Sequence, residues 1–363
     1  MTPRRLAALA AATAAAAAFA IPGVATAHSD QRGFVYTETN ASSGNSVLAF
    51  ARVDDDHLAA IGSWSTKGLG TGTGLATQGE VVLTTDGRWL LAVNAGSNDV
   101  SLFRVRDDGS LAFSDRVGSG GTDPVSVTAH GDLVYVLDAG GAGNIAGFRL
   151  DDGRLHAISG SVQPLSGGAT SPAEVAFSTN GRFLVVTERA TNMLDVYSIG
   201  DGRASAPVTS PSSGPVPYGF AFDRRNHPIV SEAANSTLSS YRLGSAGATV
   251  ISASVPTGGI AACWVAVTPN GRWAFDSNAH GGTISSFSIA RDGGIALVQS
   301  VAANTGTGSA PLDLGVTSDG RLLYVYLAGG NTIAGYRLGG GGTLIAIAGG
   351  PALPASASGL AVS

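Results

Sequence analysis

The stretch Asn180-Gly181-Arg182-Phe183-Leu184-Val185-Val186-Thr187-Glu188 joins a tight turn to an apolar run that ends in a carboxylate. Asn-Gly or Asp-Gly between two short apolar runs is the strongest local signal of a β-hairpin, and we expect both turn residues to take positive φ. The same pattern starts at Asp86, Asn270 and Asp319, and the four turn glycines are separated by 94, 90 and 49 residues. These steps are about two, two and one copies of a unit of roughly 45–50 residues, which indicates a repeat protein.

Each repeat contains four short apolar runs, which we name A to D in chain order. Run C ends in an aromatic residue, and seven such residues occur: Phe50, Phe103, Phe148, Tyr197, Tyr241, Phe287 and Tyr336. The first repeat lacks run A, while the chain ends in an orphan run, Gly359-Leu360-Ala361-Val362. Joining the two would close a ring and remove the exposed sheet edges that promote aggregation. We therefore predict an all-β, seven-bladed β-propeller with four-stranded antiparallel blades, closed by pairing of the C-terminal strand with the N-terminal blade.

The first residues have the features of a secretory signal peptide. Arg4-Arg5 precede an Ala-rich apolar run from Leu6 to Ala20, and Ala25-Thr26-Ala27 resembles a cleavage site. We expect residues 1–27 to be this leader and residues 28–363 to form one propeller domain. The prediction is a secreted or periplasmic protein, exported by the Sec route or, given the arginine pair, by the twin-arginine route.

Composition restricts the partners. The net charge is −5 and Lys67 is the single lysine, which disfavours nucleic acids and anionic membranes. No stretch has the ~18 apolar residues of a membrane span. Cys263 has no partner for an internal disulfide, and its apolar surroundings in the sequence indicate a buried small residue rather than a nucleophile. We expect a monomer that binds a small molecule.

Polar residues recur at two positions of the repeat. The chain has five glutamates, and all fall either at the end of run B or near the start of run A. In a four-stranded meander these two positions lie on one face of the disc, around the axis, so we expect an acidic, concave mouth there. The residues predicted to line this mouth are Glu38, Glu80, Asn94, Asp138, Glu232, Trp264, Asn278 and Asp313.

Blade 4 carries two of the candidate catalytic residues. Glu174 and Glu188 are 14 residues apart across a hairpin, so we expect them to be cross-strand neighbours. Such a pair could share a proton in acid–base catalysis or bind a hard cation. His280 is the one histidine expected on the mouth side and is a third acid–base candidate.

Glu38, Asp138 and Glu232 are candidates to hold a divalent cation, Ca²⁺ or Mg²⁺. The alternative is structural: carboxylates at repeated positions often cap strand ends by bonding to neighbouring backbone groups.

The repeats resemble a known family. The segments TDGRWLLAVNAGSNDVSLFRVRDDGSL (85–111) and SDGRLLYVYLAGGNTIAGYRL (318–338), with proline before run A, are similar to the seven-bladed lactonase-type propellers. That family includes bacterial 6-phosphogluconolactonase and fungal carboxymuconate cyclase. The resemblance implies this fold and chemistry on a lactone. At the starts of inner strands, where those enzymes tend to carry His and Arg, this chain has Pro172-Ala173-Glu174 and Ala262-Cys263-Trp264.

These observations favour an exported lactonase-like hydrolase that acts on a small neutral or cationic lactone or ester at the acidic mouth. An acidic mouth would repel a phosphorylated sugar acid. We expect a carboxylate of the Glu174/Glu188 pair to activate water. Two alternatives remain open at this point: an extracellular propeller that binds a ligand or protein without catalysis, and a lactone-forming cyclase or isomerase.

Overall fold

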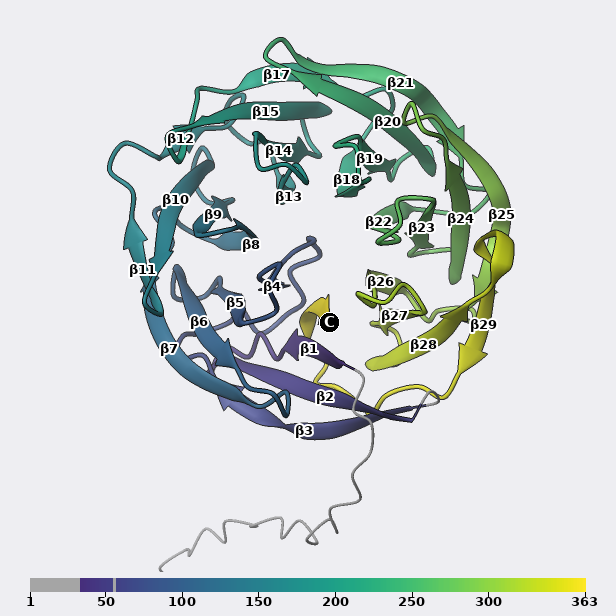
Figure 1. Cartoon of the computed structure of the whole chain (residues 1–363), viewed down its shortest axis with the longest axis horizontal. Coiled ribbons are helices and arrows are strands. Elements are labelled where there is room, and N and C mark those ends of the chain that lie inside the picture. The colour runs from purple at the N-terminus through teal and green to yellow at the C-terminus, as the bar shows by residue number, and fades with distance from the viewer. Residues whose placement is uncertain (1–32, 55–56) are drawn as a thin grey trace, which may run out of the picture.

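The computed structural model describes residues 33–54 and 57–363, so the expected signal peptide at residues 1–27 lies outside the described residues. The described chain forms seven antiparallel sheets that stand as blades around a central axis (Figure 1). This arrangement confirms the predicted seven-bladed β-propeller. None of the described helices is long and apolar enough to cross a membrane.

The strands of the first three blades follow in chain order. Blade 1 contains β1 (Phe34–Glu38), β2 (Ser46–Asp54) and β3 (His57–Ser65); blade 2 contains β4 (Val81–Leu83), β5 (Trp89–Asn94), β6 (Asp99–Val105) and β7 (Leu111–Gly118); blade 3 contains β8 (Pro124–His130), β9 (Leu133–Asp138), β10 (Asn144–Asp151), β11 (Arg154–Ala157) and β12 (Gln163–Pro164).

The remaining blades repeat the same order. Blade 4 contains β13 (Pro172–Phe177), β14 (Phe183–Glu188), β15 (Met193–Gly200), β16 (Arg203–Ala204) and β17 (Val208–Pro211); blade 5 contains β18 (Pro217–Phe222), β19 (Pro228–Glu232), β20 (Thr237–Gly244) and β21 (Gly247–Pro256); blade 6 contains β22 (Ala262–Val267), β23 (Trp273–Asn278), β24 (Thr283–Ile289) and β25 (Ile295–Asn304); blade 7 contains β26 (Pro311–Val316), β27 (Leu322–Leu327), β28 (Thr332–Leu338), the short 3₁₀ turn η1 (Gly340–Gly342) and β29 (Leu344–Ile347).

The C-terminal strand closes the ring as predicted. Strand β30 (Ser358–Val362) pairs antiparallel with β1, with Val35 opposite Val362 and Tyr36 opposite Ala361. It thereby becomes the innermost strand of blade 1 (Figure 1). The seven predicted aromatics all lie in the third strand of their blades, and their hydrophobic clusters form between neighbouring sheets. In one such cluster, Val185 and Val196 of blade 4 pack against Phe220 and Val230 of blade 5.

The recurring turns differ in one detail from the prediction. Gly87, Gly181, Gly271 and Gly320 all take φ between +66° and +69°, but the Asp or Asn before each of them does not have positive φ. Instead its side chain closes the turn: Asp86 Oδ1 accepts from the Thr84 hydroxyl at 2.6 Å and from the Arg88 N–H at 3.0 Å. The motif is therefore an Asx turn with a single left-handed glycine.

A β-bulge recurs at the start of the innermost strands. The register shifts between Pro124 and Ser126, between Pro172 and Glu174, and between Ala262 and Trp264. A bulge inserts one extra residue and re-aims the side chains that follow it. Here it changes which residues of these strands point toward the axis.

The segment between β3 and β4, residues 66–80, does not follow the rim of the disc. Figure 1 shows the chain before β4 running into the middle of the ring. We call residues 66–80 the plug. Its Gln78 N–H donates to the Ala173 carbonyl in blade 4, and its Gln78 Nε2 donates to the Val265 carbonyl in blade 6, at 3.0 Å each. The plug thus joins blade 4 to blade 6 near the axis.

Candidate functional site

The predicted site residues occupy the expected positions but divide into two sets. Glu38, Asn94, Asp138, Glu188, Glu232 and Asn278 are each the last residue of the second strand of a blade, and we call them the clasp residues. Glu80, Glu174, Trp264 and Asp313 lie at or just before the start of the innermost strands and form the axial set. All ten are buried, with at most 6% of any of them exposed. They do not line an open mouth together.

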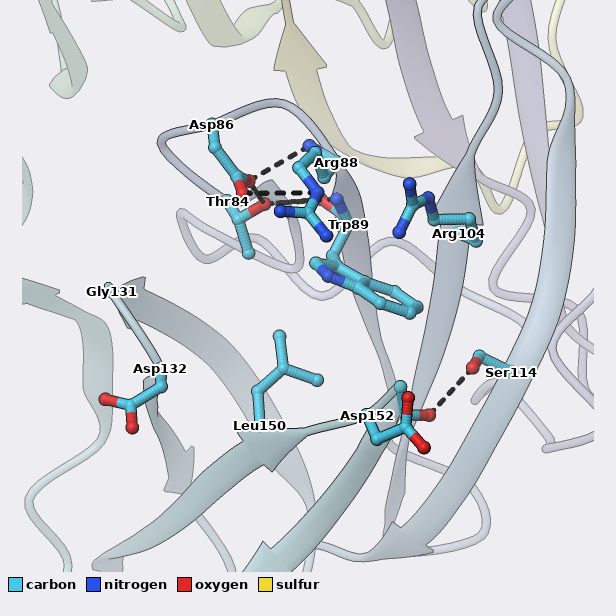
Figure 2. Close-up of a pocket in the computed structure, with 11 residues that line it drawn as sticks. Thr84, Asp86, Arg88, Trp89, Arg104, Ser114, Gly131, Asp132, Leu150 and Asp152 are labelled. Atoms are coloured by element: carbon cyan, nitrogen blue, oxygen red, sulfur yellow. Dashed lines mark hydrogen bonds and ion pairs between the residues drawn. The ribbon is translucent and has the colours of Figure 1, made fainter.

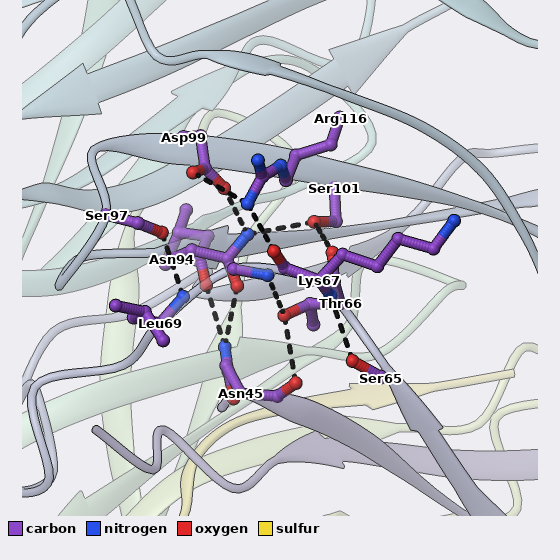
Figure 3. Close-up of polar contacts among 12 residues, drawn as sticks. Asn45, Ser65, Thr66, Lys67, Leu69, Asn94, Ser97, Asp99, Ser101 and Arg116 are labelled. Atoms are coloured by element: carbon purple, nitrogen blue, oxygen red, sulfur yellow. Dashed lines mark hydrogen bonds and ion pairs between the residues drawn. The ribbon is translucent and has the colours of Figure 1, made fainter. Parts of the chain in front are cut away.

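The clasp residues bond within and between blades, as Figure 3 shows for blade 2. Asn94 Nδ2 donates to Asp99 Oδ1 at 2.7 Å and to Ser101 Oγ at 2.8 Å. Asn45 of blade 1 donates to Asn94 Oδ1 at 3.1 Å, while the Ser101 hydroxyl donates to the Thr66 carbonyl. The group therefore ties a strand end to the connection between two blades.

The partner seven residues later recurs in other blades. Glu38 accepts from Asn45 at 2.8 Å, Glu232 accepts from Ser239 at 2.6 Å, and Asn278 donates to Ser285 at 2.8 Å. Glu232 also accepts from the Gly214 N–H and the Ser254 hydroxyl. These contacts agree with the structural role considered in the sequence analysis, in which repeated polar residues cap strand ends. The side chains hold connections between strands and do not face a ligand.

Glu174 and Glu188 do not form the expected pair. The regular ladder from the hairpin turn places Glu174 opposite Thr187, and beyond it the bulge at Ala173 places Glu188 opposite Pro172. The Glu174 carboxylate accepts from the Phe220 N–H of blade 5 at 2.6 Å, whereas the Glu188 carboxylate accepts from the Ser166 N–H at 2.9 Å. The two carboxylates therefore bond to different parts of the chain. This geometry does not support a proton shared between them.

Glu188 has another acidic neighbour, Asp195, seven residues later. Asp195 accepts from the Thr209 hydroxyl at 2.7 Å and is fully buried. Burial and the adjacent Glu188 raise the pKa of Asp195 to about 7. In blades 2, 5 and 6 the equivalent residue is a serine, so the acid–acid clasp is a feature of blade 4.

At the axis, three carboxylates from three different blades approach one another. Burial raises the pKa of Glu80 to about 7, and burial together with Glu80 raises the pKa of Asp313 well above its usual range. Burial raises the pKa of Glu174 too, with a smaller contribution from the charge of Glu80. Glu80 Oε1 accepts from the Thr77 hydroxyl at 2.8 Å and from Ser358 at 3.2 Å. The plug contributes Glu80 to this cluster and Thr77 as its hydrogen-bond donor.

The remaining member of the axial set holds the plug. Trp264 Nε1 donates to the Thr77 carbonyl at 2.7 Å. The Tyr218 hydroxyl donates to the Ala76 carbonyl, and the Tyr218 ring packs on Trp264 with centroids 5.1 Å apart. Trp264 therefore binds the plug in this structure and does not line an open ligand-binding mouth.

The proposed metal set is not brought together. Glu38, Asp138 and Glu232 belong to the clasps of blades 1, 3 and 5. Across residues 33–54 and 57–363, no group of three or more His, Cys, Asp or Glu side chains is arranged to hold one metal ion. His280 lies exposed in the turn between β23 and β24.

A pocket opens on the face of the disc where the predicted mouth was expected. It has a volume of about 400 Å³ and lies between the plug and blades 3 and 4; we call it the plug-side pocket. Its two charged lining residues are Asp123 and Arg189, and the hydroxyls of Thr71, Thr73 and Ser171 also line it.

Arg189 is fixed by its surroundings. Its Nε donates to the Ser171 carbonyl at 3.1 Å, and its Nη1 donates to the Tyr218 hydroxyl at 3.1 Å and to the Ala76 carbonyl at 3.2 Å. The guanidinium also lies 4.9 Å from the centre of the Tyr218 ring. Among the described residues, Nη2 has no hydrogen-bond partner, so this nitrogen is available to a ligand.

Asp123 has a free carboxylate within the described part of the chain. Its backbone is held with φ +56° by two bonds: its N–H donates to Asn98 Oδ1 at 2.7 Å, and its carbonyl accepts from the Ala139 N–H at 2.9 Å. Partial burial raises the pKa of its carboxyl above the usual 3.8. Asp123 was not a site candidate from the sequence. It directly precedes Pro124, the proline at the start of the innermost strand of blade 3. This position before the proline was the only feature of the sequence that could have pointed to Asp123 as a site residue.

A second pocket, of about 410 Å³, lies on the opposite face between blades 2 and 3 (Figure 2). Its charged groups are largely engaged by the turns. Asp86 closes the turn described above, the Arg104 guanidinium lies 5.2 Å from the centre of the Trp89 ring, and Asp132 pairs with Arg149. This pocket therefore offers fewer free polar groups than the plug-side pocket.

Comparisons with known proteins agree with the fold. The model of the lactonase family with a 7-bladed β-propeller matches residues 24–167, 142–238 and 228–314. A search of curated proteins found no match. Among solved structures, a candidate 6-phosphogluconolactonase from Bacteroides fragilis is 17% identical with a TM-score of 0.66, over 93% of this chain and 100% of that one.

Two further structures are similar in the same way. A candidate 6-phosphogluconolactonase from Bacteroides uniformis is 16% identical with a TM-score of 0.69, over 90% of this chain and 99% of that one. A periplasmic gluconolactonase from Pseudomonas aeruginosa is 16% identical with a TM-score of 0.66, over 91% and 98%. At these identities the likeness demonstrates the shared fold alone.

Proposed function

The chain belongs to the family of lactonases with a seven-bladed β-propeller, and from that premise we propose that it hydrolyses a small lactone in the plug-side pocket. One observation carries the proposal. In that pocket an exposed carboxylate, Asp123, and a fixed guanidinium, Arg189, line the same space as hydroxyl side chains that include Thr71. A base, an electrostatic stabiliser and hydrogen-bonding groups are the components that hydrolysis of an ester bond requires.

In the proposed reaction Asp123 is the general base. Its carboxylate takes a proton from water as the water oxygen bonds to the lactone carbonyl carbon, and Arg189 Nη2 stabilises the negative charge that forms on the carbonyl oxygen. The bond between that carbon and the ring oxygen then breaks, and the proton passes from Asp123 to the ring oxygen. This proton transfer restores the Asp123 carboxylate, and the product is an open-chain hydroxy acid that then loses a proton to solvent.

The polar groups of the pocket favour a neutral substrate with hydroxyl groups. Asp123 and Arg189 contribute opposite charges, and Thr71, Thr73 and Ser171 can exchange hydrogen bonds with a polyol. A phosphorylated lactone is less favoured, because Arg189 is the one basic residue that lines the pocket and its Nε and Nη1 are already engaged.

We propose that the protein works outside the cytoplasm as a monomer. The support is the leader-like sequence of residues 1–27 and the similarity in fold to a periplasmic gluconolactonase. A net charge of −5 with a single lysine supports a small-molecule ligand over nucleic acid.

A second candidate is a propeller that binds the same class of ligand without turnover. The observation that favours it is the burial of every glutamate in the chain, which leaves Asp123 as the single acidic residue lining the pocket. Catalysis in the plug-side pocket then depends on one carboxylate.

The experiment is a screen of the chain without residues 1–27 against unsubstituted γ- and δ-lactones, hydroxylated sugar lactones and a phosphorylated sugar lactone. Ring opening is measured by proton release, with heat-denatured protein as the blank. Turnover of hydroxylated lactones above the phosphorylated one supports the proposal. Thermal stabilisation by a lactone without turnover would instead leave the binding function as the better description.

A further inference from the structure

The clasp of blade 4 contains a second acidic residue that the clasps of blades 2, 5 and 6 lack. This residue has no part in the proposed hydrolysis. Where blades 2, 5 and 6 place Ser101, Ser239 and Ser285 beside the clasp residue, blade 4 places Asp195 beside Glu188. Two buried carboxylates in contact repel each other when both are ionised, so this exchange is costly without a compensating group.

Three hydroxyls around this pair come from three segments: the connection after β12, the β14–β15 turn and β17. The Ser166 hydroxyl donates to Glu188 Oε2 at 2.5 Å, and the Thr191 hydroxyl donates to the same oxygen. The Thr209 hydroxyl donates to Asp195 Oδ1 at 2.7 Å. The Ser166 N–H donates to the other Glu188 oxygen, Oε1, at 2.9 Å. Two hydroxyls therefore bond the Glu188 carboxylate, and a third bonds the Asp195 carboxylate beside it.

A second observation shows that this group lacks a partner. Asp195 is fully buried, and its Oδ2 has no hydrogen bond in the described chain. Neither carboxylate has an ion-pair partner among residues 33–54 and 57–363. An unpaired buried carboxylate oxygen beside a second carboxylate is the environment in which a cation replaces a missing charge.

We propose that the blade 4 clasp is a binding site for one hard divalent cation, with Ca²⁺ preferred. The protein ligands are Glu188 Oε2, Asp195 Oδ2 and the hydroxyls of Ser166, Thr191 and Thr209. Ca²⁺ takes six to eight oxygen ligands in flexible geometry, so five protein oxygens leave room for one to three waters. Mg²⁺ requires a stricter octahedron and binds more weakly to such a set.

Solvent can reach this site, because Ser166 and Thr209 are exposed while the carboxylates are buried. When the cation binds, the three hydroxyls turn their lone pairs toward it and direct their protons to water. The cation then fixes the connection that runs from Ser166 to Ser171, a residue of the plug-side pocket. The site is independent of the proposed hydrolysis, since none of its five ligands lines that pocket.

The test measures thermal unfolding and direct binding on the chain without residues 1–27, after treatment with chelator. With 1 mM CaCl₂ against NaCl of equal ionic strength, we expect the Tm to rise by about 3 °C or more, because a ligand that binds the folded state stabilises it by mass action. Equilibrium dialysis with ⁴⁵Ca²⁺ should give one ion per chain, and MgCl₂ should produce a smaller rise in Tm.

The decisive variant is Asp195→Ser, which copies the clasp of blades 2, 5 and 6 and is therefore expected to fold. It should lose both the Tm rise and the bound ⁴⁵Ca²⁺. The matched control is Asp138→Asn, which removes a buried clasp carboxylate in blade 3 and should keep both. No Tm rise and no bound ⁴⁵Ca²⁺ in the unsubstituted chain would overturn the proposal, and so would a rise that persists in Asp195→Ser.

Discussion

Trp264 donates its indole N–H to the carbonyl oxygen of Thr77 across 2.7 Å, which joins blade 6 to a segment 187 residues earlier in the chain. This bond is one of several that fix the plug over the axial carboxylates. Because the plug fills the centre of the ring, the accessible pocket lies beside the axis, between the plug and blades 3 and 4. The position of the plug therefore decides where a substrate can bind.

Removal of the indole donor should weaken the fold. In Trp264→Phe the buried Thr77 carbonyl loses this partner, and an unsatisfied buried acceptor costs about 1–3 kcal/mol. We expect the free energy of unfolding from urea titration to fall by that amount. Trp89→Phe, at a half-buried tryptophan whose indole N–H has no bond in the described chain, should cause a smaller change. An equal effect of the two substitutions would contradict this role of Trp264.

The backbone of the plug packs without space for a side chain at one glycine. A Cβ on Gly70 would lie 2.1 Å from the carbonyl carbon of Asn40, whereas a Cβ on Gly74 would meet nothing closer than 3.6 Å. Neither glycine has positive φ, so the comparison isolates packing. Gly70→Ala should lower the free energy of unfolding by about 1–3 kcal/mol, and Gly74→Ala should leave it unchanged or slightly raised. Equal stabilities of the two variants would show that the plug does not pack as described.

The axial carboxylates should make stability depend on pH. A carboxyl whose pKa is raised on folding binds more protons in the folded than in the unfolded state, so its contribution is lost as pH rises from the unfolded pKa through the folded one. For Glu80 this interval runs from the usual pKa of 4.5 to a folded-state pKa of about 7. Glu80→Gln should therefore flatten the decline in the free energy of unfolding between pH 4.5 and 7.5, by an amount on the order of 3 kcal/mol. A slope unchanged by the substitution would show that Glu80 does not cause the decline in the free energy of unfolding.

The proposed base predicts the acid side of the rate profile. Asp123 must be ionised to accept a proton from water, and partial burial raises its pKa above 3.8. As pH is lowered, kcat/KM for the best lactone should therefore fall at a higher pH than an unperturbed aspartate would give. The profile should be measured between pH 3.5 and 8, with circular dichroism to verify folding at each point. A rate that stays constant down to pH 4 would argue against a carboxylate base.

The blade architecture could be predicted from the sequence because its signals are local and repeated. The turn glycines, the aromatics from Phe50 to Tyr336 and the orphan run at Gly359 each report on a strand or turn within a few residues of themselves. Even the ends of the second strands were placed correctly, since Glu38, Glu188 and Glu232 are the last residues of β1, β14 and β19.

The site could not be predicted in the same way, for two physical reasons. The turn of the β13–β14 hairpin sets a register in which Glu174 lies opposite Thr187, one residue away from the expected pairing with Glu188. The plug is Gly-rich and has the composition of a turn, and its seat on Trp264 and Tyr218 depends on contacts between distant blades. With the axis filled, Asp123 and Arg189 become the charged residues that a ligand can reach.

The central claim is that Asp123 in the plug-side pocket performs lactone hydrolysis. The most direct measurement compares kcat/KM of Asp123→Asn and Asp201→Asn on the best lactone of the screen. Both residues take positive φ, which asparagine tolerates, and Asp201 lies in the β15–β16 turn on the opposite face. We predict a fall of roughly 100-fold or more for Asp123→Asn, as for the loss of a general base, and no change for Asp201→Asn. Full activity in Asp123→Asn would contradict the account.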